Sequence, residues 1–159
     1  MNLKNLNGLL IPINKHGKNV IKNVKTIDRS YASEECIIVF PAGLVSRKQG
    51  RTIKDLEWKK SFITMAIKYK RCIIPVYVEA QNSNFFYNLA ISRKRIGIKT
   101  NIEMFYLVDE AYRQKGKSIQ LTVGQPISYT IFTKKHSANY WANKVKEHVY
   151  ELNEGKKFM

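Results

Sequence analysis

Hydrophobic positions along the chain fall into short uninterrupted runs separated by longer stretches with a helical repeat. Apolar runs occupy residues 9–13, 36–40 and 72–78, and each is bounded by charged residues, polar residues, Gly or Pro. Uncharged runs of this length that are rich in Ile and Val are typical of strands covered on both faces. Residues 118–123 instead alternate between polar and apolar, which predicts a half-buried strand.

Helical periodicity fills the intervals between these runs. The clearest apolar stripe lies on one face of a helix predicted over residues 52–69, and it consists of Trp58, Phe62, Met65, Ala66 and Tyr69. Thr52 and Asp55 begin that helix with a spacing close to a capping box. Three further helices are predicted, at residues 19–33, 103–114 and 137–152.

The order of these elements predicts an α/β fold. Strand 36–39, a basic loop, helix 52–69 and strand 72–78 together form a right-handed crossover unit with its polar loops on one edge. We therefore expect a layered, mostly parallel sheet flanked by helices. At 159 residues the chain is long enough to bury a core, and we interpret residues 1–159 as a single domain.

Residues suited to ligand binding follow the end of the buried strand predicted at residues 36–39. Pro41 has no N–H to donate and stops the strand ladder. Gly43 permits a backbone conformation, or a close approach, that a Cβ would block. Ser46 and Arg47 follow, just past the carboxyl end of the strand, where ligands bind in open α/β sheets. The alternative is a strand that ends in an ordinary turn.

The charge of the chain restricts its partners. Lys and Arg number 28 against 12 Asp and Glu, a formal net charge of +16, which favours phosphates, anionic lipid surfaces or acidic proteins. Nucleic acid is the generic hypothesis for so basic a protein. However, the sequence has no RNP-type strand, no paired Cys/His metal spacing and no recognition-helix pattern, so nucleic acid is not favoured as a partner. A basic nucleic-acid-binding module and a membrane-surface module stay open as alternatives.

A second region combines aromatic and basic residues. Residues 85–89 carry three aromatic side chains, and a basic cluster follows at residues 93–95. Aromatic rings at headgroup level beside cations that contact phosphates are typical of a membrane interface. Ordinary core aromatics followed by a basic turn explain the same letters equally well.

Three blocks of the sequence resemble the glycerolipid acyltransferases, the lysophosphatidic acid acyltransferase superfamily. Residues 40–47 (Phe-Pro-Ala-Gly-Leu-Val-Ser-Arg) are similar to the Phe-Pro-Glu-Gly-Thr-Arg-Ser-like block of that family, and residues 74–76 are similar to its later block, a Pro within a hydrophobic strand. Residues 8–14 resemble an earlier block, in which a Gly precedes an apolar strand and an Arg. Residues 82–87 resemble the branch called hemolysin-like acyltransferases. The blocks occur in the family order over roughly residues 8–90.

The sequence also departs from the family pattern. Ala42 stands where the family has a Glu that is expected to engage hydroxyls of the acceptor, and Asn14 replaces the early Arg, with Lys15 beside it. The departure leaves aminoacyl lipids open as acceptors beside glycerol phosphates. A His and an Asp separated by four residues should precede Gly8, but no such pair occurs in the chain. The residues five positions after His16, His136 and His148 are Ile21, Trp141 and Asn153.

The resemblance implies a lipid acyltransferase. In that family the His removes the proton of a lipid hydroxyl, which attacks an acyl thioester, and the Asp orients the His. The implied acyl donor is acyl-CoA or acyl carrier protein, with no cofactor and no metal, and the acceptor is a lysophospholipid or another lipid hydroxyl. Since the His/Asp pair is missing, we expect this chain alone to be inactive and to lack the N-terminal catalytic block. The implied substrate-binding residues are Gly43, Ser46, Arg47, Lys15 and Arg51.

The same resemblance predicts where the protein works. No apolar run approaches the roughly 20 residues needed to span a bilayer. The residues after Met1 lack the apolar core of a signal peptide. We therefore expect a cytoplasmic protein that is peripheral on the inner face of the membrane and is held there by its cations, since each Lys or Arg near an anionic surface contributes about 1 kcal/mol.

Overall fold

The structure, a computed structural model, describes residues 9–11, 21–155 and 157–158 of the chain. It divides into two compact units, residues 1–39 and residues 40–159. The first unit contains helix α1 (Ile21–Ala32), so the helix predicted over residues 19–33 is confirmed for the described residues. Ser33 closes α1: its N–H donates to the carbonyl of Arg29 and its hydroxyl donates to the carbonyl of Ser30.

The strands expected in the first unit are not found among its described residues. Residues 9–11 and 34–39 have no strand conformation, and residues 12 and 13 of the expected strand lie outside the described part. The side chain of Ile38 is 78% exposed. An apolar run identifies residues that suit a strand, but the strand forms only where another strand satisfies its backbone N–H and C=O groups.

The second unit contains a two-stranded antiparallel sheet instead of the expected parallel one. Strand β3 (Val76–Glu79) pairs with β4 (Gln120–Val123), with Val76 opposite Val123. A bridge between Ile73 and Ile127 extends the ladder. The α/β composition is therefore confirmed, but the predicted parallel pairing of residues 36–39 with 72–78 is not found. Residues 36–39 are not in a strand, and β3 pairs instead with β4, which corresponds to the strand predicted for residues 118–123.

 Strand β3 ends at Glu79 and β4 begins at Gln120, so this pairing joins two segments that are far apart in the sequence.

A β-hairpin replaces the first part of the helix predicted over residues 52–69. Strands β1 (Arg47–Gln49) and β2 (Thr52–Lys54) pair antiparallel, with Arg47 opposite Lys54. Gly50 has a φ of +63°, which a tight turn between the strands requires and which Gly adopts without steric cost. Thr52 and Asp55 therefore do not form a capping box, and helix α2 (Ser61–Lys68) begins nine residues later than predicted.

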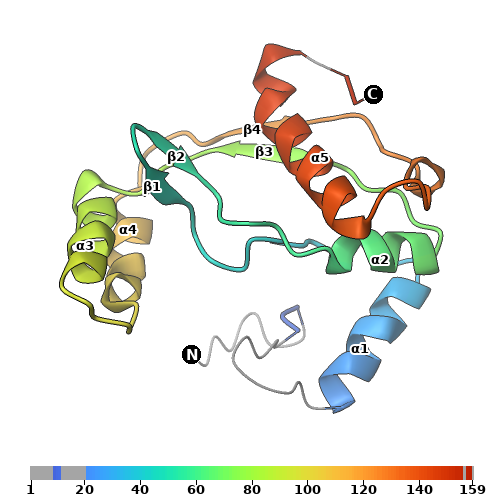
Figure 1. The fold of residues 1–159 in the computed structure, drawn as a ribbon, viewed down its shortest axis with the longest axis horizontal. Helices are drawn as coiled ribbons and strands as arrows, with labels where there is room; N and C mark the ends of the chain where they lie inside the picture. Colours follow the sequence, from blue (N-terminus) through green and yellow to red (C-terminus); the bar gives the residue numbers. More distant parts are fainter. Residues whose placement is uncertain (1–8, 12–20, 156, 159) are drawn as a thin grey trace. The chain divides into compact units, whose positions relative to one another are not determined.

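The core of this unit forms between α2 and α5 (Ala138–Glu151), and α5 also crosses the β3–β4 ribbon (Figure 1). Ser137 caps α5 by accepting a hydrogen bond from the N–H of Tyr140, so the helix predicted over residues 137–152 is confirmed. Short 3₁₀ turns at Tyr129–Ile131 and Leu152–Glu154 flank α5. The buried core residues are Trp58, Phe62, Ile63, Ile127, Phe132, Ala142, Val145 and Val149.

A second packed region surrounds α3 (Asn84–Arg95), which contacts a 3₁₀ turn at Ile102–Tyr106 and strand β1. Helix α4 (Leu107–Tyr112) continues directly from the 3₁₀ turn, close to the helix predicted over residues 103–114. Phe86, Tyr87 and Ala90 supply the buried apolar face of α3. Among the described residues, no helix is long and apolar enough to cross a membrane.

Candidate functional site

Residues 40–47 form a tight turn followed by an extended segment that leads into β1. The carbonyl of Phe40 accepts a hydrogen bond from the N–H of Gly43 at 3.0 Å. Pro41 occupies the second position of this turn, where its fixed φ is favourable. Gly43 has a φ of +64°, so the special backbone conformation predicted for this Gly is confirmed.

A polar cluster centred on Asp55 fixes the end of this segment. The Ser46 hydroxyl donates to Oδ1 of Asp55 at 2.6 Å, and Nε1 of Trp58 donates to Oδ2 at 3.0 Å. The N–H of Asp55 donates to the phenol oxygen of Tyr150 at 2.8 Å. The Lys146 ammonium donates to the carbonyl of Asp55 at 2.8 Å. Hydrogen bonds therefore hold both the backbone and the side chain of Asp55, and its carboxylate orients the hydroxyl of Ser46.

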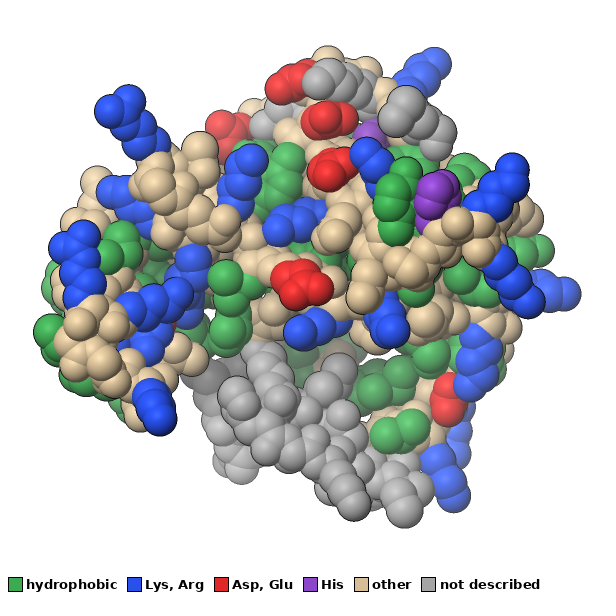
Figure 2. Space-filling model, viewed as in Figure 1, with side chains coloured by type: hydrophobic (Ala, Val, Ile, Leu, Met, Phe, Trp, Pro, Cys, Tyr) green, Lys and Arg blue, Asp and Glu red, His purple; other side chains and the backbone are tan. Residues whose placement is uncertain are grey.

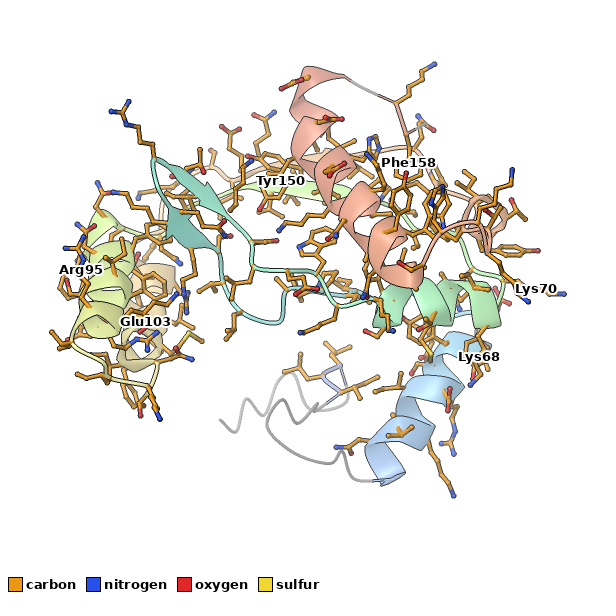
Figure 3. All side chains as sticks on the ribbon, in the orientation of Figure 1. Lys68, Lys70, Arg95, Glu103, Tyr150 and Phe158 are labelled. Carbon is orange, nitrogen blue, oxygen red and sulfur yellow. The ribbon has the colours of Figure 1, made fainter. Side chains whose placement is uncertain are left out.

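Tyr150 brings α5 into this cluster from more than ninety residues away in the sequence (Figure 3). Burial raises the pKa of the Tyr150 phenol, and the N–H of Asp55 opposes that shift. The phenol therefore stays protonated at neutral pH, with its oxygen accepting from the backbone. Its ring lies edge-on to Tyr77 of β3 at 6.1 Å, which ties the cluster to the sheet.

Arg47 lies inside the protein and not on its surface. Its Nη2 donates to Oε1 of Glu103 at 3.0 Å, and Nε of Arg93 donates to Oε2 of the same carboxylate at 2.8 Å. The side chain of Glu103 is fully buried between the two guanidinium groups (Figure 3). Nη1 of Arg47 also donates to the carbonyl of Val45, and its guanidinium lies over the ring of Phe86 at 5.5 Å.

This ion-pair cluster joins the end of the Phe40–Arg47 segment to the α3 region. Burial lowers the pKa of Arg47, and the carboxylate of Glu103 opposes that shift. Arg47 donates its hydrogen bonds to groups inside the protein, so it has a structural role. A substrate-binding role was also predicted for it. That role stays a prediction, as it does for Gly43 and Ser46.

An open depression lies next to the turn at Pro41. The N–H of Lys59 donates to the carbonyl of Pro41 at 3.1 Å, which holds the two segments together. The depression is lined by two ammonium groups, two hydroxyls, an amide, one carboxylate and an indole ring, so it offers donors to an anionic headgroup beside an apolar surface. Its lining residues are Glu57, Trp58, Lys59, Lys60, Ser61, Thr64 and Asn139.

Two further residues were predicted to bind substrate, Arg51 and Lys15. Arg51 is exposed in the turn between β1 and β2. Lys15 lies outside the described residues. Sequence reasoning missed Tyr150, Glu103 and the functional position of Asp55, because these side chains reach the site through tertiary contacts that carry no local sequence signal.

The aromatic and basic residues of α3 divide between the core and the surface, and the membrane-interface role stays a prediction. Phe86 and Tyr87 are buried, and Arg93 is buried in the ion pair with Glu103. The side chain of Phe85 is 52% exposed. Ser83 caps the helix through the N–H of Phe86, and its own N–H and hydroxyl donate to the buried carboxylate of Glu110.

The two described histidines are packed against aromatic rings. His136 stacks on Tyr140 with ring centroids 4.0 Å apart, and His148 lies edge-on to Phe158 at 5.2 Å. His148 is buried, and this burial lowers its pKa below the ordinary value of 6.5, with Glu151 opposing the shift. His148 is therefore a neutral His of the core, and His136 is part of an aromatic stack. Neither arrangement is that of a base oriented by a carboxylate.

The buried His148 predicts a pH dependence of stability. The unfolded chain takes up a proton at His148 before the folded chain does, so the free energy of unfolding should decrease as the pH falls below about 6.5. Denaturant unfolding between pH 7 and about pH 5.5, above the range in which most carboxylates titrate, measures this slope. We expect His148→Gln to flatten it and the exposed control His136→Gln to leave it unchanged. Equal slopes in wild type and His148→Gln would contradict the assignment.

Comparison with known proteins identifies a family and two similar proteins. The model of a protein family described as Acyltransferase matches residues 1–157. The chain is 48% identical over 152 residues to a lyso-glycine lipid O-acyltransferase of Phocaeicola vulgatus, which covers 96% of this chain and 54% of the relative. It is 45% identical over 152 residues to a protein of the same name from Bacteroides thetaiotaomicron, which covers 96% of this chain and 56% of the relative. The chain thus spans about half the length of these curated relatives. No solved structure matches it.

Proposed function

The chain belongs to the acyltransferase family, and from this premise we propose that it forms the lipid-acceptor part of an O-acyltransferase that acts on a lyso-glycine lipid. The observation that carries the proposal is the identity of 45–48% with two relatives of that name over nearly the whole chain. In the proposed reaction a hydroxyl of the acceptor attacks an acyl thioester, loses its proton to a base and releases the thiol. Acyl-CoA or acyl carrier protein is the proposed donor.

The Phe40–Arg47 segment supports an acceptor without a glycerol headgroup. Ala42 is partly buried and packs against the hydrophobic core, so its position offers no polar side chain to an acceptor. The resemblance places a Glu there in relatives that engage acceptor hydroxyls. A headgroup built on glycine has no glycerol hydroxyls to engage, which fits an apolar side chain at this position.

We place the acceptor headgroup in the depression beside Pro41. Lys59 and Lys60 line it and supply positive charge for a headgroup carboxylate, and the Trp58 ring supplies an apolar wall. Behind this wall, Asp55 holds both the Trp58 indole and the Ser46 hydroxyl, so the shape of the depression depends on the polar cluster. Gly43 and Ser46 remain the proposed backbone and hydroxyl contacts, with Arg51 and Lys15 as further cations.

Binding of a soluble short-chain lyso-glycine lipid to the purified chain tests this placement. We expect Lys59→Gln/Lys60→Gln to weaken binding by at least about tenfold, because two charge-assisted contacts are lost. Lys68→Gln/Lys70→Gln is the matched control, since it removes the same charge at the opposite end of α2 (Figure 3). Isothermal titration calorimetry measures both. Equal losses in the two double variants would show a general charge effect and would remove the depression from the proposal.

A further inference from the structure

The 3₁₀ turn at Ile102–Tyr106 and helix α4 carry an exposed apolar stripe. Phe105, Val108 and Tyr112 follow the spacing i, i+3, i+7, which places them on one face of a helix. Their side chains are 78%, 50% and 73% exposed. We call these three residues the apolar ridge. An amphipathic helix in a globular protein normally buries such a stripe, so an exposed stripe marks an interaction surface.

A pair of exposed aromatic rings lies next to the apolar ridge. Phe85 of α3 lies edge-on to Tyr106, with ring centroids 5.2 Å apart. Both side chains are more than two fifths exposed, at 52% and 41%. The contact extends the apolar surface from the ridge onto the start of α3, so that two separate elements contribute to it.

Exposed cations flank this surface in the sequence. Among residues 84–117, all of which the structure describes, Asp109 is the exposed carboxylate, whereas Glu103 and Glu110 are buried. Figure 2 shows Lys and Arg side chains gathered over the α3 region. The exposed cations of this stretch are Lys94, Arg95, Lys99, Arg113, Lys115 and Lys117.

We propose that the apolar ridge and its surrounding cations dock the protein on an anionic membrane surface. Exposed Phe and Tyr side chains insert at the level of the lipid headgroups, and Lys and Arg contact the lipid phosphates. The excess of exposed positive charge complements anionic lipids. An acidic protein partner would share the charge complementarity, but insertion into a bilayer accounts for the exposed Phe105 and Tyr112 rings as well.

The inference rests on the proposed function, because an enzyme part that binds a lipid acceptor has to meet the membrane that contains it. The structure also connects the two surfaces. Glu103 precedes the apolar ridge by two residues and binds Arg47, which ends the Phe40–Arg47 segment of the candidate site. The Arg47–Glu103 ion pair therefore joins the ridge to the Phe40–Arg47 segment.

Sedimentation of the purified chain with vesicles of phosphatidylcholine, with and without phosphatidylglycerol, tests the proposal. We expect binding to the anionic vesicles, and a loss of at least about tenfold in Phe105→Ser/Tyr112→Ser, because two exposed rings leave the interface. Lys94→Gln/Arg95→Gln should lose about thirtyfold on anionic vesicles, and the loss should diminish at high salt. This charge pair tests the surface even if the ridge variant fails to fold.

Matched controls separate this surface from the rest of the protein. Leu121→Ser removes an exposed apolar side chain of β4, and Lys68→Gln/Lys70→Gln removes two cations from α2; both should bind vesicles like wild type. Soluble lyso-glycine lipid should bind the ridge variant as it binds wild type, so failure of acceptor binding and failure of membrane docking are distinguishable. The proposal is overturned if wild type does not bind the vesicles, if the controls lose as much as the test variants, or if the variants lose binding to acyl carrier protein while their vesicle binding is unchanged.

Discussion

Glu103→Ala is expected to lower the free energy of unfolding of the second unit by about 3–5 kcal/mol, because it leaves two buried guanidinium groups without their shared carboxylate. Arg47 and Arg93 have side chains that are 7% and 5% exposed, so water cannot replace the lost partner without opening the structure. The whole stability of a domain is about 5–15 kcal/mol, so this loss takes a large part of it. The cost reflects the two charges left behind and not the net value of the ion pair.

Denaturant unfolding followed by Trp fluorescence measures this effect, because both Trp58 and Trp141 lie in the second unit. Glu57→Ala is the matched control, since it removes an exposed carboxylate of the same unit and should change the free energy of unfolding by no more than about 0.5 kcal/mol. If Glu103→Ala unfolds within about 1 kcal/mol of wild type, the buried ion-pair cluster does not hold the α3 region in place.

The helices were the part of the fold that sequence reasoning predicted best. α5 and its Ser137 cap follow directly from an apolar repeat with a good N-cap, both of which are local properties. The predicted helix over residues 52–69 began too early because Thr52 and Asp55 fit a capping box, while the turn at Gly50 determines a hairpin. Strand pairing was predicted least well, because the pattern of one strand does not identify its partner.

The candidate site shows the same division between local and long-range information. The special backbone of Gly43 follows from Pro and Gly chemistry within one turn, and the structure confirms it. The partner of Ser46 is Asp55, nine residues away, and the partner of Arg47 is Glu103, 56 residues away. No property of residues 40–47 predicts those contacts, so a cation that was predicted to face a ligand proved to be buried.

The lack of the family's His/Asp spacing in the sequence predicts the second large effect. The sequence contains no His followed five residues later by Asp, and the described histidines are packed against aromatic rings. A general base contributes typically about 10²–10⁴-fold to the rate of such a reaction. We therefore expect acyl transfer by the purified chain to be lower than that of the full-length Phocaeicola vulgatus relative by at least this factor, with either acyl-CoA or acyl carrier protein as donor.

The acyl-transfer rate of the purified chain with lyso-glycine lipid tests directly whether this part of the enzyme binds the acceptor without catalysing transfer. Calorimetric binding of the same lipid to the same preparation shows that the protein is competent to bind, and the relative serves as the positive control for turnover. We predict saturable binding of the acceptor with no turnover above the protein-free reaction. Turnover by the chain alone, or the absence of acceptor binding, would contradict it.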